Sequence, residues 1–182
     1  MSSLLTSAPE PPGVVVWLTG LPSSGKSTLA ALVARCLRAA GRHACVLDGD
    51  EVRAALVPAP GYAPDARDAF YATLARLAAL LAGQGFVVLV PATAHRAAYR
   101  AEARRRAPAF VEVFVDADPA ECRRRDAKGL YAATQRGAAT GLPGADLAYE
   151  PPTAPDVVAH GGQDEAAVAE ILARLAALRS AP

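Results

Sequence analysis

The sequence predicts an α/β fold with a mostly parallel sheet, because apolar runs of strand length alternate with helical patterns along the chain. A second observation is the phosphate-loop pattern at 20–28, which reads Gly-Leu-Pro-Ser-Ser-Gly-Lys-Ser-Thr. The third is its setting, since a buried strand over 13–18 precedes the loop and an amphipathic helix over 26–40 follows it. Together they predict a P-loop NTPase fold.

Length and composition limit the possible functions. The chain has 182 residues, which suits one domain over 13–182 after a short disordered lead-in over 1–12. A formal net charge of +1 argues against a nucleic-acid surface. No apolar run approaches the roughly 20 residues that a membrane span needs. Because no signal peptide is recognisable and the three cysteines are scattered, we expect a cytoplasmic protein with reduced thiols.

The first half of the chain continues the alternation of strand and helix. An apolar run over 43–47 predicts a second strand, and a short helix is expected over 51–56. A Pro- and Gly-rich loop leads to a long helix over 65–82, whose leucines recur at helical spacing and which two glycines terminate.

The second half completes the pattern and contains one irregular stretch. Asp118 suits the N-cap of a helix and Pro119 its first turn. The stretch over 126–155 is rich in Gly and Pro, which is typical of a lid or binding loop. The expected elements are a strand over 86–90, a helix over 95–106, a strand over 110–115, a helix from 118, a strand over 156–159 and a helix over 165–178.

The residue types of the phosphate loop suit a nucleotide triphosphate. Gly20 and Gly25 allow the backbone to turn so that successive N–H groups converge on phosphate oxygens. Lys26 brings a positive charge to the β- and γ-phosphates, and the Ser27 hydroxyl suits a Mg²⁺ coordination shell. The loop residues expected to bind ATP are Gly20, Ser23, Ser24, Gly25, Lys26, Ser27 and Thr28.

Polar residues follow the expected strands, where an open α/β sheet binds its ligands. Asp50 is the candidate catalytic base for an acceptor hydroxyl; the alternative is that it caps the following helix, and both roles are compatible. Asp48 is expected to orient Mg²⁺ through water, with a turn-forming role in Asp-Gly as the alternative. Thr93 follows the third strand.

Several basic residues are candidates for neutralising phosphate charge. Arg53 and Arg67 could grip an anionic acceptor, although a lone arginine is more often a solvated surface charge. A basic segment over 123–131 leads into the irregular stretch and could close over ATP. For Arg123 and Arg124 a solvated helix face is the favoured interpretation.

Three motifs together with the phosphate loop resemble the adenylylsulfate kinase family. They are Leu-Asp-Gly-Asp-Glu-Val-Arg over 47–53, Asp-Ala-Lys-Gly-Leu-Tyr over 126–131 and Gly-Ala-Asp-Leu-Ala-Tyr-Glu-Pro-Pro over 144–152. The resemblance runs in order over 12–178. It implies a nucleoside-kinase-like three-layer fold with a five-stranded sheet and a lid. It also implies phosphoryl transfer from ATP to adenosine 5′-phosphosulfate with Mg²⁺, and a homodimer, since family members are commonly dimers.

The resemblance also assigns site residues by matching position. Asp50 would be the acceptor-side carboxylate, Lys26 would act on the ATP phosphates, and Arg125 would lie near the ATP base. Arg53 and Arg67 would hold the phosphosulfate. The residues expected to contact the acceptor are Asp48, Asp50, Arg53, Arg67, Phe70, Thr93, Lys128, Leu130 and Tyr131.

The chain departs from the family pattern on the acceptor side. Phe70, Tyr71, Ala72 and Thr73 stand where the family has Asn-Ile-Arg-Arg, and Leu142 stands where it has an aromatic residue that stacks on adenine. Three hypotheses therefore remain open: an adenylylsulfate kinase, a related kinase with a different small anionic acceptor, and an ATP-binding regulatory protein without turnover. The carboxylate of Asp50 favours an enzyme, because a pure binder does not need it.

Overall fold

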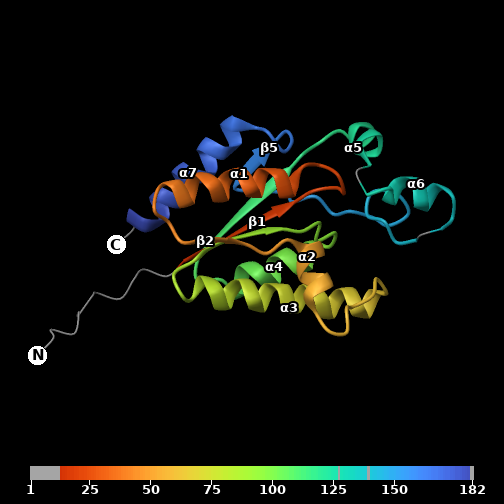
Figure 1. Ribbon diagram of the computed structural model, residues 1–182, viewed down its shortest axis with the longest axis horizontal. Helices are drawn as coiled ribbons and strands as arrows, with labels where there is room; N and C mark the ends of the chain where they lie inside the picture. Colours follow the sequence, from red (N-terminus) through yellow and green to blue (C-terminus); the bar gives the residue numbers. More distant parts are fainter. Residues whose placement is uncertain (1–12, 127, 139, 181–182) are drawn as a thin grey trace, which may run out of the picture.

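A parallel sheet forms the centre of the computed structural model, which describes residues 13–126, 128–138 and 140–180 (Figure 1). The lead-in expected over 1–12 lies outside the described residues. Within that part, the sheet has five strands in the order β2-β3-β1-β4-β5, all paired in parallel. The strands are β1 (Val14–Thr19), β2 (Ala44–Val46), β3 (Val87–Pro91), β4 (Phe110–Val115) and β5 (Val157–Ala159).

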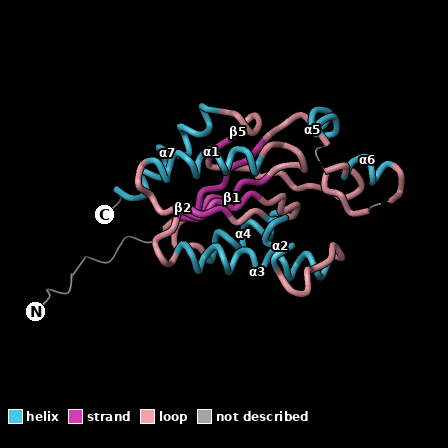
Figure 2. The backbone as a smooth tube through the Cα atoms, in the orientation of Figure 1, coloured by secondary structure: helices cyan, strands magenta, loops and turns pink. Residues whose placement is uncertain are grey.

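Helices cover both faces of this sheet, as the tube view shows (Figure 2). The first and last helices of the chain enclose one core with the sheet. The two helices on either side of β3 in the sequence pack together and enclose a second core on the other face. The helices are α1 (Lys26–Ala39), α2 (Gly49–Ala55), α3 (Pro64–Ala82), α4 (Ala97–Arg106), α5 (Pro119–Arg125), α6 (Leu130–Gln135) and α7 (Glu165–Ser180).

Strand β1 supplies side chains to both cores because successive residues of a strand point to opposite faces. Val16 and Leu18 pack with α1 and α7, whereas Val15 and Trp17 pack with α3 and α4. All residues of β1 are buried, which explains its continuous apolar sequence. The expected three-layer α/β/α fold is thereby confirmed.

The N-terminus of α2 differs from the expectation. The helix begins at Gly49, and Asp48 is its N-cap because the Asp48 carboxylate accepts a hydrogen bond from Asp50 N. Asp50 is therefore not the cap, and its side chain is left for another role. The N-cap expected at Asp118 is confirmed, since its carboxylate accepts from Ala120 N and Pro119 is the first residue of α5.

The stretch expected to be irregular contains the short helix α6. Its first turn is stabilised by Asp126, whose carboxylate accepts hydrogen bonds from Tyr131 N and Ala132 N. Gly129 precedes the helix in a left-handed conformation. In Figure 1, α6 projects beyond the end of the sheet together with the segments around it. We refer to the described residues of 126–155 as the lid.

No helix of the described residues has the length and apolarity needed to cross a membrane. The described cysteines are free thiols.

The packing of α7 gives a stability prediction. Ile171 is fully buried between α7 and the sheet, so Ile171→Ala is expected to lower the free energy of unfolding by about 2–5 kcal/mol. Leu178 lies on the same helix but is 43% exposed, so Leu178→Ala should change it by less than about 1 kcal/mol. Urea unfolding measures both variants, and equal losses would contradict the packing described here.

Candidate active site

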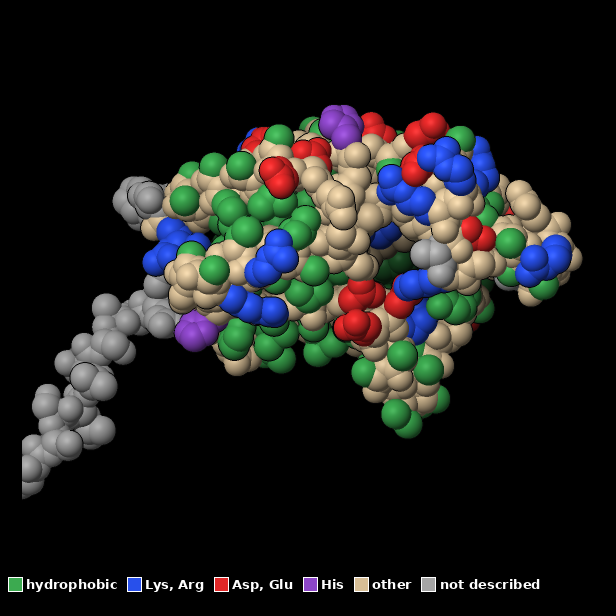
Figure 3. Space-filling model, turned by 45° about the horizontal axis from the view of Figure 1, so that its top comes forward, with side chains coloured by type: hydrophobic (Ala, Val, Ile, Leu, Met, Phe, Trp, Pro, Cys, Tyr) green, Lys and Arg blue, Asp and Glu red, His purple; other side chains and the backbone are tan. Residues whose placement is uncertain are grey.

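A cavity of about 960 Å³ opens at the carboxyl end of the sheet. Figure 3 shows the opening, with acidic and basic side chains on its rim. Its walls come from the phosphate loop, the start of α2, the start of α3, the loop after β3, the lid and the loop after β5. This is where the topology of an open parallel sheet places a ligand.

The two glycines of the phosphate loop are needed for close backbone approach. Gly20 has φ 153° and Gly25 has φ 102°. A Cβ at Gly20 would lie 2.5 Å from the carbonyl oxygen of Val115, and one at Gly25 would lie 2.4 Å from Gly162 N. Any side chain at either position would force the loop apart from β4 or from the loop after β5.

Lys26 lies buried at the centre of the loop. Its ammonium donates hydrogen bonds to the carbonyl oxygens of Gly20 (3.0 Å) and Leu21 (2.7 Å). Burial lowers the pKa of Lys26 to about 8, while Cys122, Asp50 and Asp48 act in the opposite direction. A cation held in this way gives the loop a strong attraction for anions.

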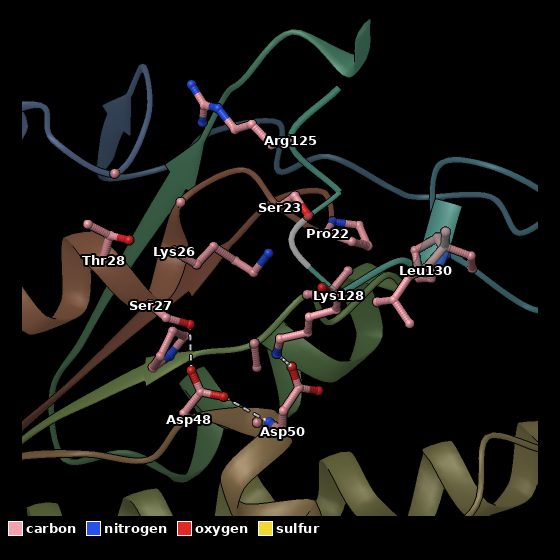
Figure 4. A pocket seen from close by; sticks show the side chains of 18 of the residues that line it. Pro22, Ser23, Lys26, Ser27, Thr28, Asp48, Asp50, Arg125, Lys128 and Leu130 are labelled. Carbon is pink, nitrogen blue, oxygen red and sulfur yellow. Dashed lines mark hydrogen bonds and ion pairs between the residues drawn. The ribbon is translucent and has the colours of Figure 1, made fainter. Parts of the chain in front are cut away.

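Ser27 and Asp48 connect the phosphate loop to α2. The Ser27 hydroxyl donates to Asp48 Oδ2 at 2.5 Å, while Asp48 Oδ1 accepts from Asp50 N at 2.9 Å (Figure 4). The hydroxyl oxygen of Ser27 and the carboxylate oxygen of Asp48 are the kind of ligand atoms that Mg²⁺ prefers. The described residues contain no cluster of three His, Cys, Asp or Glu side chains that would hold a metal ion without help from a ligand.

Asp50 faces Lys128 across the cavity, and the two form an ion pair (Figure 4). Both side chains are more than half exposed, so solvent screens the pair. The Asp50 carboxylate raises the pKa of Lys128. The carboxylate proposed to contact the acceptor therefore lies beside the phosphate loop and is matched to a lysine of the lid.

Arg53 and Arg67 are buried, so the alternative of solvated surface charges is wrong for both. Arg53 Nη1 donates to the carbonyl oxygens of Pro60 and Gly61, and its guanidinium lies 3.8 Å from the ring centroid of Phe70. Arg67 donates from Nε to the Tyr62 carbonyl and from Nη2 to the Gly141 carbonyl, both at 2.6 Å. The two guanidinium groups form a basic wall and fasten neighbouring loops to it.

The remaining expected residues divide into those that line the cavity and those that support it. Tyr131 is buried against Cys122 and Leu142, and its hydroxyl donates to the Pro22 carbonyl at 3.2 Å. It supports the lid from behind the wall. Gly20 and the buried Ser24 form the inner part of the loop. The expected residues on the lining are Ser23, Gly25, Lys26, Ser27, Thr28, Asp48, Asp50, Arg53, Arg67, Phe70, Thr93, Arg125, Lys128 and Leu130.

The sequence reasoning missed the loop after β5. Residues 160–164 line the cavity beside Thr28 and the phosphate loop. A signal was present, since the Gly161-Gly162 pair comes one residue after the expected strand end at 159. Tyr62 was also missed, although its ring lies 4.5 Å from the Arg53 guanidinium.

Comparison with known proteins gives a consistent result. A family model described as "Adenylylsulphate kinase" matches residues 12–160. The "Probable adenylyl-sulfate kinase" of Synechocystis sp. is 43% identical over 145 residues, which cover 80% of this chain and 82% of that protein. The solved structure of the Mycobacterium tuberculosis APS kinase CysC in complex with AMPPNP and APS superposes with a TM-score of 0.83. That match has 40% identity and covers 92% of this chain and 99% of the other.

The fold of the lid gives a second prediction. Asp146 accepts hydrogen bonds from Gly141 N and Leu142 N, both at 2.6 Å, and these bonds hold its pKa below the usual value. In Asp146→Ala, the amides of Gly141 and Leu142 should therefore exchange their hydrogens roughly 3- to 10-fold faster at pH 7.

Asp164→Ala is the matched control, because Asp164 accepts from His160 N in the loop after β5 and from Ala167 N in the first turn of α7. It should accelerate exchange only at its own two amides. Because the pKa of Asp146 is lowered, the lid bonds persist in mildly acidic solution and are lost as the pH falls through that lowered pKa. Unchanged exchange at 141–142 in Asp146→Ala would contradict this role.

Proposed function

We propose that this chain, which belongs to the adenylylsulphate kinase family, transfers the γ-phosphoryl group of ATP to a hydroxyl of adenosine 5′-phosphosulfate. The products are ADP and the 3′-phospho form of the acceptor. One observation carries the proposal: a single cavity joins a phosphate loop with its lysine to a carboxylate and a basic wall. The relatives named above carry the same activity in their names.

On the ATP side, we assign the phosphates to the loop around Lys26. Converging main-chain N–H groups and the start of α1 favour an anion there, and Lys26 adds a full charge. Arg125 lines the same cavity, and we assign it to the nucleotide side; it also forms an ion pair with Glu121 on α5.

Ser27 and Asp48 are the residues that would hold Mg²⁺, Asp48 through a water molecule. A hydroxyl and a carboxylate oxygen in hydrogen-bond contact fit an ion that takes few protein ligands and completes its shell with phosphate and water. When bound, the ion neutralises charge on the phosphates.

On the acceptor side, Asp50 acts as the base. As the acceptor hydroxyl oxygen forms its bond to the γ-phosphorus, the bond to the bridging oxygen breaks and ADP leaves with that electron pair. The hydroxyl proton passes to the Asp50 carboxylate. Arg53 and Arg67 supply positive charge for the phosphosulfate, and Lys128 pairs with Asp50 before the acceptor arrives.

A second candidate acceptor is another small anionic alcohol. The observation that favours it is the apolar cover of the basic wall, since Phe70 and Tyr62 flank the Arg53 guanidinium. Both candidates use the same ATP site and the same base.

An acceptor screen tests the proposed function. Purified protein with ATP and Mg²⁺ is expected to release ADP at a much higher rate when adenosine 5′-phosphosulfate is added. Stimulation by a different anionic alcohol alone would favour the second candidate. If the protein binds ATP but releases no ADP with each of the acceptors tested, it is a regulatory protein instead.

We also propose a single cytoplasmic domain that forms a homodimer. The free thiols fit a cytoplasmic protein, and the dimer is what the family resemblance implies. Light scattering on the purified chain gives its oligomeric state, and a monomer at micromolar concentration would contradict the dimer.

Substitution of Asp50 tests the base. Because Asp48 rather than Asp50 caps α2, Asp50→Asn should leave the helix intact and lower kcat by roughly 10²- to 10⁴-fold with little change in the KM for ATP. Glu51→Gln is the matched control, since it neutralises the exposed neighbouring acid and should retain near-normal turnover. Normal kcat in Asp50→Asn would remove this residue from the mechanism.

Substitution of Lys26 tests the phosphate site. Lys26→Ala removes the buried cation from the loop, so turnover should fall by roughly 10³-fold or more. Arg38→Ala, which removes an exposed cation at the far end of α1, should keep nearly full activity. The same ADP-release assay measures both variants, and comparable activity in both would exclude the phosphate role of Lys26.

A further inference from the structure

Ala94 has an unusual backbone conformation next to the acceptor wall. It lies in the loop between β3 and α4 with φ 43°, in the left-handed region that side-chain-bearing residues rarely adopt. Its neighbours Pro91, Ala92 and Thr93 line the cavity, and Ala94 itself is fully buried. A disfavoured conformation at such a place persists only when the surroundings hold it.

Two buried side chains hold the peptide groups of Ala94 from opposite sides. Ala94 N donates to the Tyr71 hydroxyl oxygen at 3.0 Å, and the Ala94 carbonyl accepts from Arg100 Nη1 at 2.7 Å. Both side chains are less than a tenth exposed. Neither backbone group can rotate to the common conformation without breaking a buried hydrogen bond.

Each of the two side chains is itself fixed. Arg100 donates from Nε to Glu112 Oε1 on β4 and from Nη2 to the Glu150 carbonyl in the lid, at 2.7 and 2.8 Å. The Tyr71 ring stacks on Tyr99 with a centroid distance of 4.4 Å. Sheet, lid and both helices of this face therefore all contribute to the position of one peptide.

The same loop is anchored on its other side. Ala92 N donates to the Leu18 carbonyl at 3.0 Å, and the Thr93 carbonyl accepts from the Thr19 hydroxyl at 2.6 Å. Thr93 thus lies between an anchor on β1 and the strained residue, with its side chain half-buried at the cavity. A change of conformation at Ala94 would move Thr93 first.

We propose that Tyr71 is a positioning residue for the acceptor. Its hydroxyl, together with Arg100, holds Ala94 in the left-handed conformation and so sets the place of Thr93 in the acceptor wall. The inference rests on the proposed function, because it assigns this wall to the acceptor. Tyr71 belongs to α3 and lines the same cavity, and its hydroxyl contacts the loop after β3 rather than the phosphate loop, so we expect its effect mainly on the acceptor side.

Tyr71→Phe removes the hydroxyl and keeps the ring. We expect the KM for adenosine 5′-phosphosulfate to rise roughly 3- to 10-fold, the usual effect of one lost buried hydrogen bond, with the KM for ATP unchanged. Tyr99→Phe is the matched control: it removes a hydroxyl from the same aromatic cluster, but that hydroxyl binds Asp68 and not the loop. Its kinetics should stay within about twofold of the parent chain.

The double variant Tyr71→Phe with Ala94→Gly separates positioning from general stability. Glycine adopts a positive φ without strain, so the loop should return to its place and recover most of the acceptor KM. Because glycine also relieves the strain at position 94, the rescue is scored on the KM for adenosine 5′-phosphosulfate and not on the free energy of unfolding.

Equal changes in both KM values, or a double variant no better than Tyr71→Phe, would overturn the proposal. A crystal structure of Tyr71→Phe gives a readout that does not depend on turnover. Ala94 should have left the left-handed region there, and an unchanged φ would also overturn the proposal. If the parent chain fails to phosphorylate adenosine 5′-phosphosulfate, the proposed function is wrong. The φ of Ala94 in the Tyr71→Phe structure still decides whether Tyr71 positions this loop.

Discussion

The hydrogen bond from Ser27 to Asp48 joins the phosphate loop after β1 to the turn after β2, and the site depends on both segments. In the strand order β2-β3-β1-β4-β5, the loop after β1 and the turn after β2 are separated by β3. The Asp48 side chain spans this gap, and Gly49 makes it possible because a Cβ there would lie 3.2 Å from Ala92 Cβ. The crevice between β1 and β3 is the switch point of the sheet, since the chain leaves these strands in opposite directions. The phosphate loop and the Asp50 carboxylate consequently share one rim of the cavity.

Buried positive charge is the second constraint on this site. Lys26, Arg53 and Arg67 are each less than a tenth exposed, and burying an unpaired cation costs several kcal/mol. Their side chains donate hydrogen bonds to backbone carbonyls, which supply dipoles but no compensating full charge. The cavity therefore keeps a net attraction for anions at both of its ends. The carboxylates of Asp48 and Asp50 lie at the rim of the cavity, where they contact Ser27 and Lys128 without cancelling the attraction for anions.

Most of the fold could be predicted from the sequence, and the parts that could not share a physical cause. Strand and helix bounds agree within a few residues because their signal, an apolar periodicity, is local. The short helix α6 has no apolar stripe and depends on Asp126. The burial of Arg53 and Arg67 was unpredictable, because their partners are carbonyl groups, which every residue type carries. Arg100 is similar: it lies in the helix expected over 95–106, where nothing local marks it as inward-facing, yet it is buried against Glu112.

The position of the lid and the charge of the acceptor are coupled through shared groups. Arg67 holds the Gly141 carbonyl at the return of the lid, and Lys128 at its base pairs with Asp50. Both cations also line the cavity, so an anion bound there competes for the same donors that fasten the lid. The Lys128 pair is solvent-exposed and yields readily, whereas the Arg67 contact is buried and does not. Under the proposed function, we expect the base of the lid near Asp50 to rearrange first when an acceptor enters, which would free the Asp50 carboxylate for the hydroxyl that arrives with it.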